Sequence, residues 1–148
     1  QAGEPFRLDV LFYAQSMIAE PHDGTVRDRF VHLLDAVWPR QAVFRTEAIM
    51  VDLIDVALAG GEDVPRLAAA VMLHLRPQPE WPEIHKFHDL DAAAAQHPLE
   101  VLALLDCIAP KEVARPVYGM DEIVRAILAA MPDLEGDRRV ERLRQATA

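Results

Sequence analysis

The sequence has few cysteine, aromatic and serine residues, and each shortage excludes a class of protein. Cys107 is the only cysteine among 148 residues, so no disulfide can form within the chain, and a reducing compartment is the default expectation. Cys107 lies in an apolar run, which favours a small buried thiol over a nucleophile. Ser16 is the only serine, and no glycine elbow surrounds it. Aromatic residues make up only 6%, so we expect a mainly aliphatic core.

Long apolar runs and phosphate-binding glycine loops are also missing. No segment approaches the roughly 20 apolar residues that cross a bilayer, and the N-terminus lacks the basic-then-apolar pattern of a signal peptide. Gly60-Gly61 is followed by Glu62, which does not suit phosphate. Because the sequence shows neither a membrane-spanning segment nor a signal peptide, we expect a cytoplasmic location. Because the sequence begins at Gln1 rather than Met, we also expect a fragment of a larger protein.

Basic residues are fewer than acidic ones, 15 against 24, which gives a net charge of −9. An acidic surface repels phosphate backbones and anionic lipids, so we expect no nucleic-acid partner and no membrane partner. A neutral or basic protein partner, or another domain of the parent chain, is favoured instead. Thirteen of the basic residues are arginine and two are lysine, a composition that suits a bacterial protein with GC-rich coding.

What the chain does have is helical periodicity with recurring stops. The phrase LLDAVWP at 33–39 returns as LLDCIAP at 104–110, and looser versions end at Pro77 and Pro132. Each indicates the last turns of a buried helix, stopped where proline cannot continue it. The intervals between the first three of these stops lie within the range of helix-pair repeats.

The sequence therefore predicts an all-α single domain over 1–148, with about eight helices in stacked antiparallel hairpins. Either an irregular orthogonal bundle or a short HEAT-like solenoid would accommodate them. The helices are expected at about 5–20, 25–38, 42–59, 63–75, 82–96, 98–108, 121–131 and 138–145. The third is the most apolar and should be packed on several sides, and the Gly60-Gly61 pair should end it.

Aromatic and imidazole groups gather in one segment, and this segment is the predicted binding surface. It combines the proline-rich loop 77–82 with the helical segment expected at 83–91. The candidate binding residues are Trp81, His85, Phe87 and His88. We expect a non-catalytic protein-interaction or regulatory module, with no catalytic residue, metal or cofactor, in which a rigid helical stack presents this surface to a protein partner.

A second hypothesis arises from His88-Asp89, which resembles the doublet of the HD-domain phosphohydrolases, an all-α family. The resemblance implies a divalent metal that activates water, a role that neutral imidazole and carboxylate ligands suit. The remaining ligands that it implies are an upstream His and a downstream Asp: His32 or His74, and Asp106 or Asp121. His85 and His88 also share one helical face and could share a metal; the alternative is a solvated polar face.

A third hypothesis is an acidic inhibitor or immunity protein that binds a basic partner through a dense carboxylate patch. Two further charged groups have more than one interpretation each. Asp52 and Asp55, three apart on the most apolar helix, are either an acid/base pair, the helix's solvent-exposed strip, or partners of an arginine such as Arg45 or Arg66. The arginine-rich tail 138–144 is either a docking strip for an acidic partner or a solvated helical cap.

Overall fold

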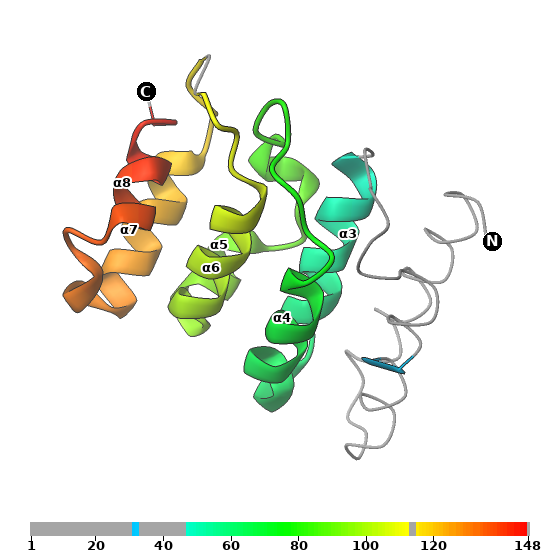
Figure 1. Ribbon diagram of the computed structural model, residues 1–148. Coiled ribbons are helices and arrows are strands. Elements are labelled where there is room, and N and C mark those ends of the chain that lie inside the picture. Colours follow the sequence, from blue (N-terminus) through cyan, green and yellow to red (C-terminus); the bar gives the residue numbers. More distant parts are fainter. Residues whose placement is uncertain (1–30, 33–46, 113–114, 148) are drawn as a thin grey trace. The chain divides into compact units, whose positions relative to one another are not determined.

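The protein is all-helical in the part of the chain that its computed structural model describes, residues 31–32, 47–112 and 115–147. These ranges contain six α-helices and three short 3₁₀ helices, and no strand (Figure 1). The all-α prediction is confirmed for this part. The expected number of eight helices is not confirmed. The helix expected at 5–20 lies outside the described residues, and of the helix expected at 25–38 only residues 31–32 are described, which are helical. Bundle or solenoid packing of the whole chain stays a prediction.

The chain divides into two compact units, residues 1–76 and 77–148. In the first unit, α3 (Glu47–Leu58) packs against α4 (Val64–Met72). Burial extends all around α3, as its apolar sequence predicts. Its buried residues are Ile49, Met50, Val51, Leu53, Ile54, Asp55, Val56 and Ala57.

A glycine pair ends α3 and starts the short 3₁₀ helix η1 (Gly61–Asp63) that leads into α4. Gly61 has a φ of 58°, the left-handed conformation that glycine adopts without penalty. Gly60 is needed for a different reason, since a Cβ there would lie 2.3 Å from Cδ1 of Leu67. The predicted stop is therefore confirmed, and it also allows α4 to approach the end of α3 closely.

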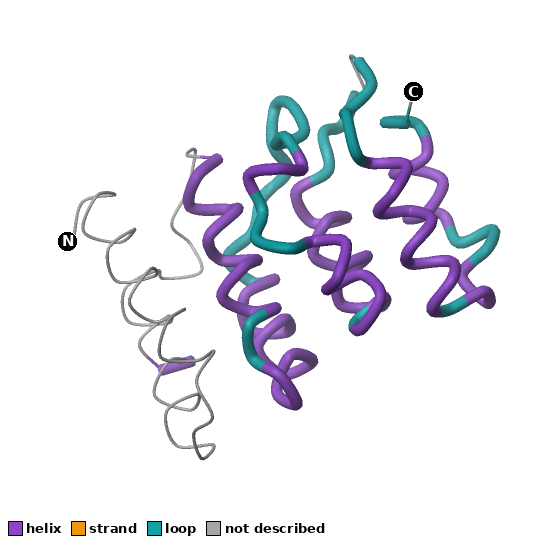
Figure 2. Tube along the Cα trace, turned by 180° about the vertical axis from the view of Figure 1, so that it is seen from behind, coloured by secondary structure: helices purple, strands orange, loops and turns teal. Residues whose placement is uncertain are grey.

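The second unit contains α5 (Leu90–Gln96), α6 (Pro98–Ile108), α7 (Met120–Ala130) and α8 (Arg138–Arg144), with η3 (Pro132–Leu134) between the last two. Helix α5 packs against α6 and α7, and α8 packs against the same two helices (Figures 1 and 2). The buried stripe of α6 is Val101, Leu102, Leu104, Leu105 and Ile108. Both α6 and α7 end two residues before a proline, which confirms the predicted stops at 110 and 132.

The helix expected over 82–96 is wrong in its first half. A single 3₁₀ turn, η2 (Ile84–Lys86), is followed by a break, and α5 begins only at Leu90. Phe87 is extended, with φ −80° and ψ 152°, and it is buried. Asp89 has a φ of 49°, a left-handed conformation that Asp adopts more readily than most residues. The break places Phe87 in the core while His88 and Asp89 stay exposed.

Candidate functional site

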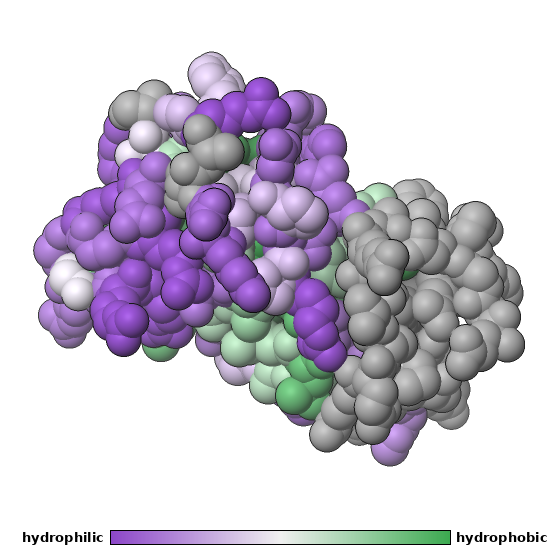
Figure 3. Space-filling model, turned by 45° about the horizontal axis from the view of Figure 1, so that its top comes forward, coloured by the Kyte–Doolittle hydropathy of each residue, from purple (hydrophilic) through white to green (hydrophobic). Residues whose placement is uncertain are grey.

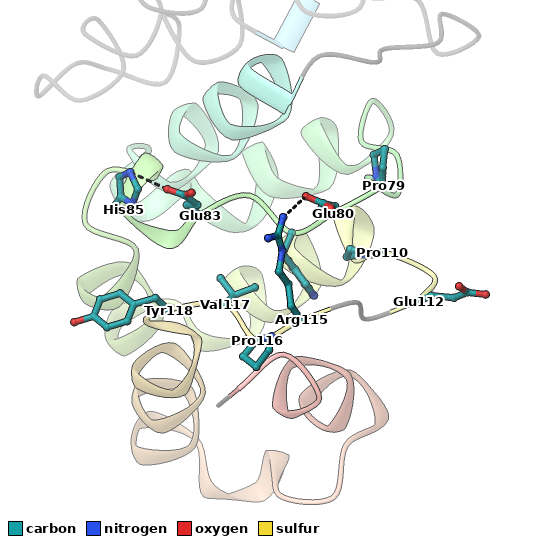
Figure 4. Close-up of a pocket in the computed structure, with 11 residues that line it drawn as sticks. Pro79, Glu80, Glu83, His85, Pro110, Glu112, Arg115, Pro116, Val117 and Tyr118 are labelled. Carbon is teal, nitrogen blue, oxygen red and sulfur yellow. Dashed lines mark hydrogen bonds and ion pairs between the residues drawn. The ribbon is translucent and has the colours of Figure 1, made fainter.

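Two loops of the second unit line a pocket of about 350 Å³ (Figure 4). The first loop is 79–85, which includes the start of η2, and the second is 110–118, described at 110–112 and 115–118, which precedes α7. In Figure 1 the two loops emerge at the same end of the helices. The lining residues are Pro79, Glu80, Trp81, Glu83, His85, Pro110, Glu112, Arg115, Pro116, Val117 and Tyr118.

One backbone hydrogen bond ties an end of each loop to the rest of the second unit. The N–H of Gln78 donates to the carbonyl of Ile108 at 3.0 Å, which ties the first loop to the end of α6. The N–H of Val117 donates to the carbonyl of Ala146 at 2.7 Å, which ties the second loop to the segment after α8. These two bonds anchor the ends of both pocket loops.

The two loops also meet directly beside the pocket. Gly119 has a φ of 89°, and a Cβ there would lie 3.4 Å from Cβ of Ile84. The end of the second loop is therefore packed on η2 of the first. This contact and the backbone bonds set the separation of the pocket walls.

Charged side chains surround the opening. Glu80 and Arg115 form an ion pair of 3.3 Å that connects the two loops, and Glu83 pairs with His85 at 3.2 Å (Figure 4). Glu112 is exposed and forms no ion pair with any residue that the structure describes. The pocket thus has three carboxylates against one guanidinium, so its charge is negative when His85 is neutral.

Aromatic groups supply the apolar part of the site. Trp81 is 9% exposed, and its Nε1 is buried without a hydrogen-bond partner in the described part of the chain. A buried indole N–H usually has such a partner. Tyr118 is 98% exposed, and Figure 4 shows its ring directed outward from the second loop. An exposed aromatic ring beside a pocket is typical of binding surfaces.

The structure brings together two of the four candidate binding residues. Trp81 and His85 both line the pocket. Phe87 is buried at 6% exposure and belongs to the core, while His88 is exposed outside the pocket. Reasoning from sequence missed the second loop, including Arg115 and Tyr118. The sequence signal that could have indicated this loop is its combination of prolines, an arginine and a tyrosine, which is typical of exposed binding segments.

The ligands implied by the HD resemblance are not assembled in the described residues. No group of three or more His, Cys, Asp or Glu side chains in those ranges could hold a metal ion. The candidate carboxylates have other contacts, since Asp106 pairs with Arg142 at 2.9 Å and Asp121 with Arg125 at 3.7 Å. His85 is likewise paired with Glu83 in the pocket.

Other reactive groups lie in helices rather than in the pocket. Cys107 is half-buried on α6, and burial, followed by the charge of Asp106, raises the pKa of its thiol. A raised pKa keeps the thiol protonated and therefore a poor nucleophile. Asp52 is half-buried on α3, where burial raises the pKa of its carboxyl, and Asp55 is buried on the same helix.

The arginine-rich tail is largely engaged in ion pairs. Arg139 binds Asp137 at 3.1 Å, and Arg144 binds both Glu135 and Glu141. With Arg142 paired to Asp106, every arginine of the tail except Arg138 has a carboxylate partner among the described residues. Docking strip and solvated cap both stay predictions.

The surface around the pocket is hydrophilic. Figure 3 brings the loop end forward, and hydrophilic side chains cover most of the part of the second unit visible there. In the described ranges, no helix combines the length and the apolar character needed to cross a membrane.

Comparison with known proteins finds no match: no family model, no curated protein and no solved structure resembles this chain. The pocket is therefore the feature from which function must be argued. It combines two aromatic lining residues, Trp81 and Tyr118, with more carboxylates than permanent cations.

Proposed function

We propose that this chain is a non-catalytic α-helical interaction or regulatory module of a larger cytoplasmic protein, and that its pocket binds a segment of a protein partner. The observation that carries the proposal is the pocket between loops 79–85 and 110–118, which is lined by prolines and aromatic rings and fixed by backbone hydrogen bonds. Such surfaces recognise extended peptide segments.

The pocket suits part of a macromolecule better than a whole small molecule. Its volume of about 350 Å³ is near the lower end of ligand cavities, which run from about 300 to 1,000 Å³. Tyr118, at 98% exposure, stands at its edge. A ligand confined to the hollow would leave this ring in water, whereas a longer segment that continues over the rim would cover it.

Catalysis receives less support from the same residues. The pocket's charged side chains are exposed, namely those of Glu80, Glu83, His85 and Arg115. Catalytic acids and bases usually depend on burial to shift their pKa values. Instead, Glu80 and Arg115 form an exposed ion pair and Glu83 contacts His85, and exposed polar contacts of this kind are weak and easily exchanged for contacts with a partner. Charged side chains whose contacts are easily replaced favour a role in binding a partner.

Fluorescence of Trp81 provides a direct test. The chain has two tryptophans, so Trp38→Phe leaves Trp81 as the only reporter in the pocket. Peptides would be selected from a random displayed library on the purified chain and then titrated into this variant. We expect a change in Trp81 emission, and we expect Tyr118→Ala to weaken binding at least severalfold.

Leu99→Ala is the matched control, because Leu99 is also a large exposed apolar residue, at 41%, and lies on α6 outside the pocket. It should leave peptide affinity unchanged. Failure to enrich any peptide, or equal binding by the Tyr118→Ala variant, would contradict the proposal.

The acidic inhibitor hypothesis is supported only by the net charge of −9. It predicts a basic partner protein and an affinity that falls steeply with salt because many charge pairs form. Tyr118→Ala separates the two possibilities, since it should weaken binding at the pocket and leave binding through a separate carboxylate patch unchanged.

A further inference from the structure

Arg115 crosses the pocket. Figure 4 shows its side chain extending from the second loop to Glu80 on the first, residues that lie 35 positions apart in the sequence. Both partners remain well exposed, at 77% and 64% of their side-chain surface. An ion pair so exposed contributes little to stability, so it need not persist when a ligand binds.

The carboxylates outnumber the cations at this position. Glu80, Glu83 and Glu112 all line the pocket, and only Arg115 opposes them with a permanent positive charge. Glu112 has no ion pair within the described residues. Figure 4 shows Glu112 directed away from the pocket, so a cation inside the pocket would be attracted mainly by Glu80 and Glu83 of the first loop.

We propose that the pocket binds a Lys or Arg side chain of the partner segment, and that Arg115 occupies the place of this cation in the unbound protein. This inference rests on the proposed function and specifies its ligand. On binding, the ligand's cation pairs with Glu80 in place of Arg115, and the Arg115 side chain rotates into solvent. Arg115 is thus an intramolecular competitor rather than a contact for the partner.

The aromatic residues suit the same ligand. A cation over the face of Trp or Tyr is attracted by the ring, and Trp81 and Tyr118 both line the pocket with the carboxylates. The indole Nε1 of Trp81 has no partner in the described part of the chain. A backbone carbonyl of the bound segment could accept from it after a small shift of the lining side chains.

An anionic ligand is the opposite case, in which Arg115 itself would bind the partner. The two cases predict opposite effects of the same substitution. Arg115→Gln should strengthen binding if Arg115 competes with the ligand and weaken binding if it contacts the ligand. This sign is the decisive measurement.

The probes are two fluorescent peptide libraries, acetyl-XXRXX-amide and the same library with citrulline, the neutral isostere, in place of arginine. Wild-type protein should bind the arginine library more tightly. We expect Arg115→Gln to raise that affinity about two- to fivefold and Glu80→Gln to lower it by a similar factor, the range of an exposed ion pair. Neither variant should alter binding of the citrulline library.

Glu122→Gln and Arg125→Gln are charge-matched controls, since both residues are exposed on α7 and neither lines the pocket. The double variant Glu80→Gln/Arg115→Gln separates competition from general repulsion. If Arg115 acts by occupying Glu80, its substitution has no further effect once Glu80 is neutral. If Arg115 only repels the ligand at a distance, the gain persists in the double variant, and the inference is overturned.

The failures of the two proposals can be told apart. Equal binding of both libraries, or weaker binding of the arginine library by Arg115→Gln, overturns the inference but leaves peptide binding intact. Lack of binding to either library, together with no peptide enriched from the random library, overturns the proposed function as well.

Discussion

Helix α6 and the two pocket loops belong to the same unit but depend on different forces. The inner residues of α6, such as Leu102, Leu104 and Leu105, are fully buried. In the loops, Arg115, Pro116 and Tyr118 are exposed, and backbone hydrogen bonds to Ile108 and Ala146 hold the segments in place. Burial in the helices therefore supplies most of the stability, and substitutions in the loops can change binding with little loss of folding free energy.

The largest expected effect is in α6. Leu105→Ala should lower the free energy of unfolding by about 2–5 kcal/mol, the loss caused by a cavity in a packed core. Leu99→Ala is the control on the same helix, because Leu99 is 41% exposed, and it should cost less than about 1 kcal/mol. Urea denaturation of the two variants measures the difference. Equal losses would show that α6 is not the one-sided core helix described above.

A smaller effect is expected where α4 meets the end of α3. Gly60→Ala would place a Cβ 2.3 Å from Cδ1 of Leu67, and overpacking of this kind costs about 1–3 kcal/mol. Leu67→Ala removes the clash together with the core contact. The two substitutions should therefore be non-additive, with the double variant more stable than the sum of the single losses predicts. Simple additivity in urea denaturation would refute the contact.

Two carboxyl groups, Asp52 on a buried helix and Asp137 on an exposed segment, should make the stability of the protein depend on pH in opposite ways. Burial raises the pKa of Asp52 on α3, while hydrogen bonds from the side chain and backbone of Arg139 lower the pKa of Asp137. A raised folded-state pKa means that stability is lost as pH rises above the unfolded value of about 3.9. A lowered pKa means that stability is lost as pH falls below that value.

Asp52→Asn and Asp137→Asn should therefore change the pH dependence in opposite directions. In urea midpoints measured from pH 2 to pH 7, Asp137→Asn should remove part of the acid-induced loss. Asp52→Asn should instead remove a loss that occurs as the pH rises. A variant with the same pH profile as the wild type would show that its carboxyl has no shifted pKa.

Helices with a complete apolar stripe could be predicted from the sequence. Ile123 and Ile127 on α7, and Val101 and Leu105 on α6, have the spacing that one buried face requires, and all four are buried. Proline stops could be predicted for the same reason, because proline excludes further helix locally. These features depend on neighbours within a few turns.

The pocket and the break before α5 could not be predicted in this way. Asp89 takes a left-handed φ that usually signals glycine, so the residues around it fit a continuous helix equally well. The ion pair between Glu80 and Arg115 joins positions 35 apart, and no local pattern places them together. Phe87 was expected to belong to the binding surface, whereas its extended backbone directs it into the core.

The smallest effect is expected at His88, which lies between η2 of the first pocket loop and helix α5. His88→Ala should change the free energy of unfolding by no more than about 0.5 kcal/mol, since the side chain is exposed. His74→Ala is the control on a buried imidazole, at 1% exposure, and should cost more than about 1 kcal/mol. The HD hypothesis predicts the reverse for His88: a stoichiometric metal by elemental analysis, and a stability loss on its removal that His88→Ala reproduces. A stable His88→Ala protein, with a melting temperature that does not respond to a chelator in either form, would exclude that role and leave His88 as a surface residue beside the pocket.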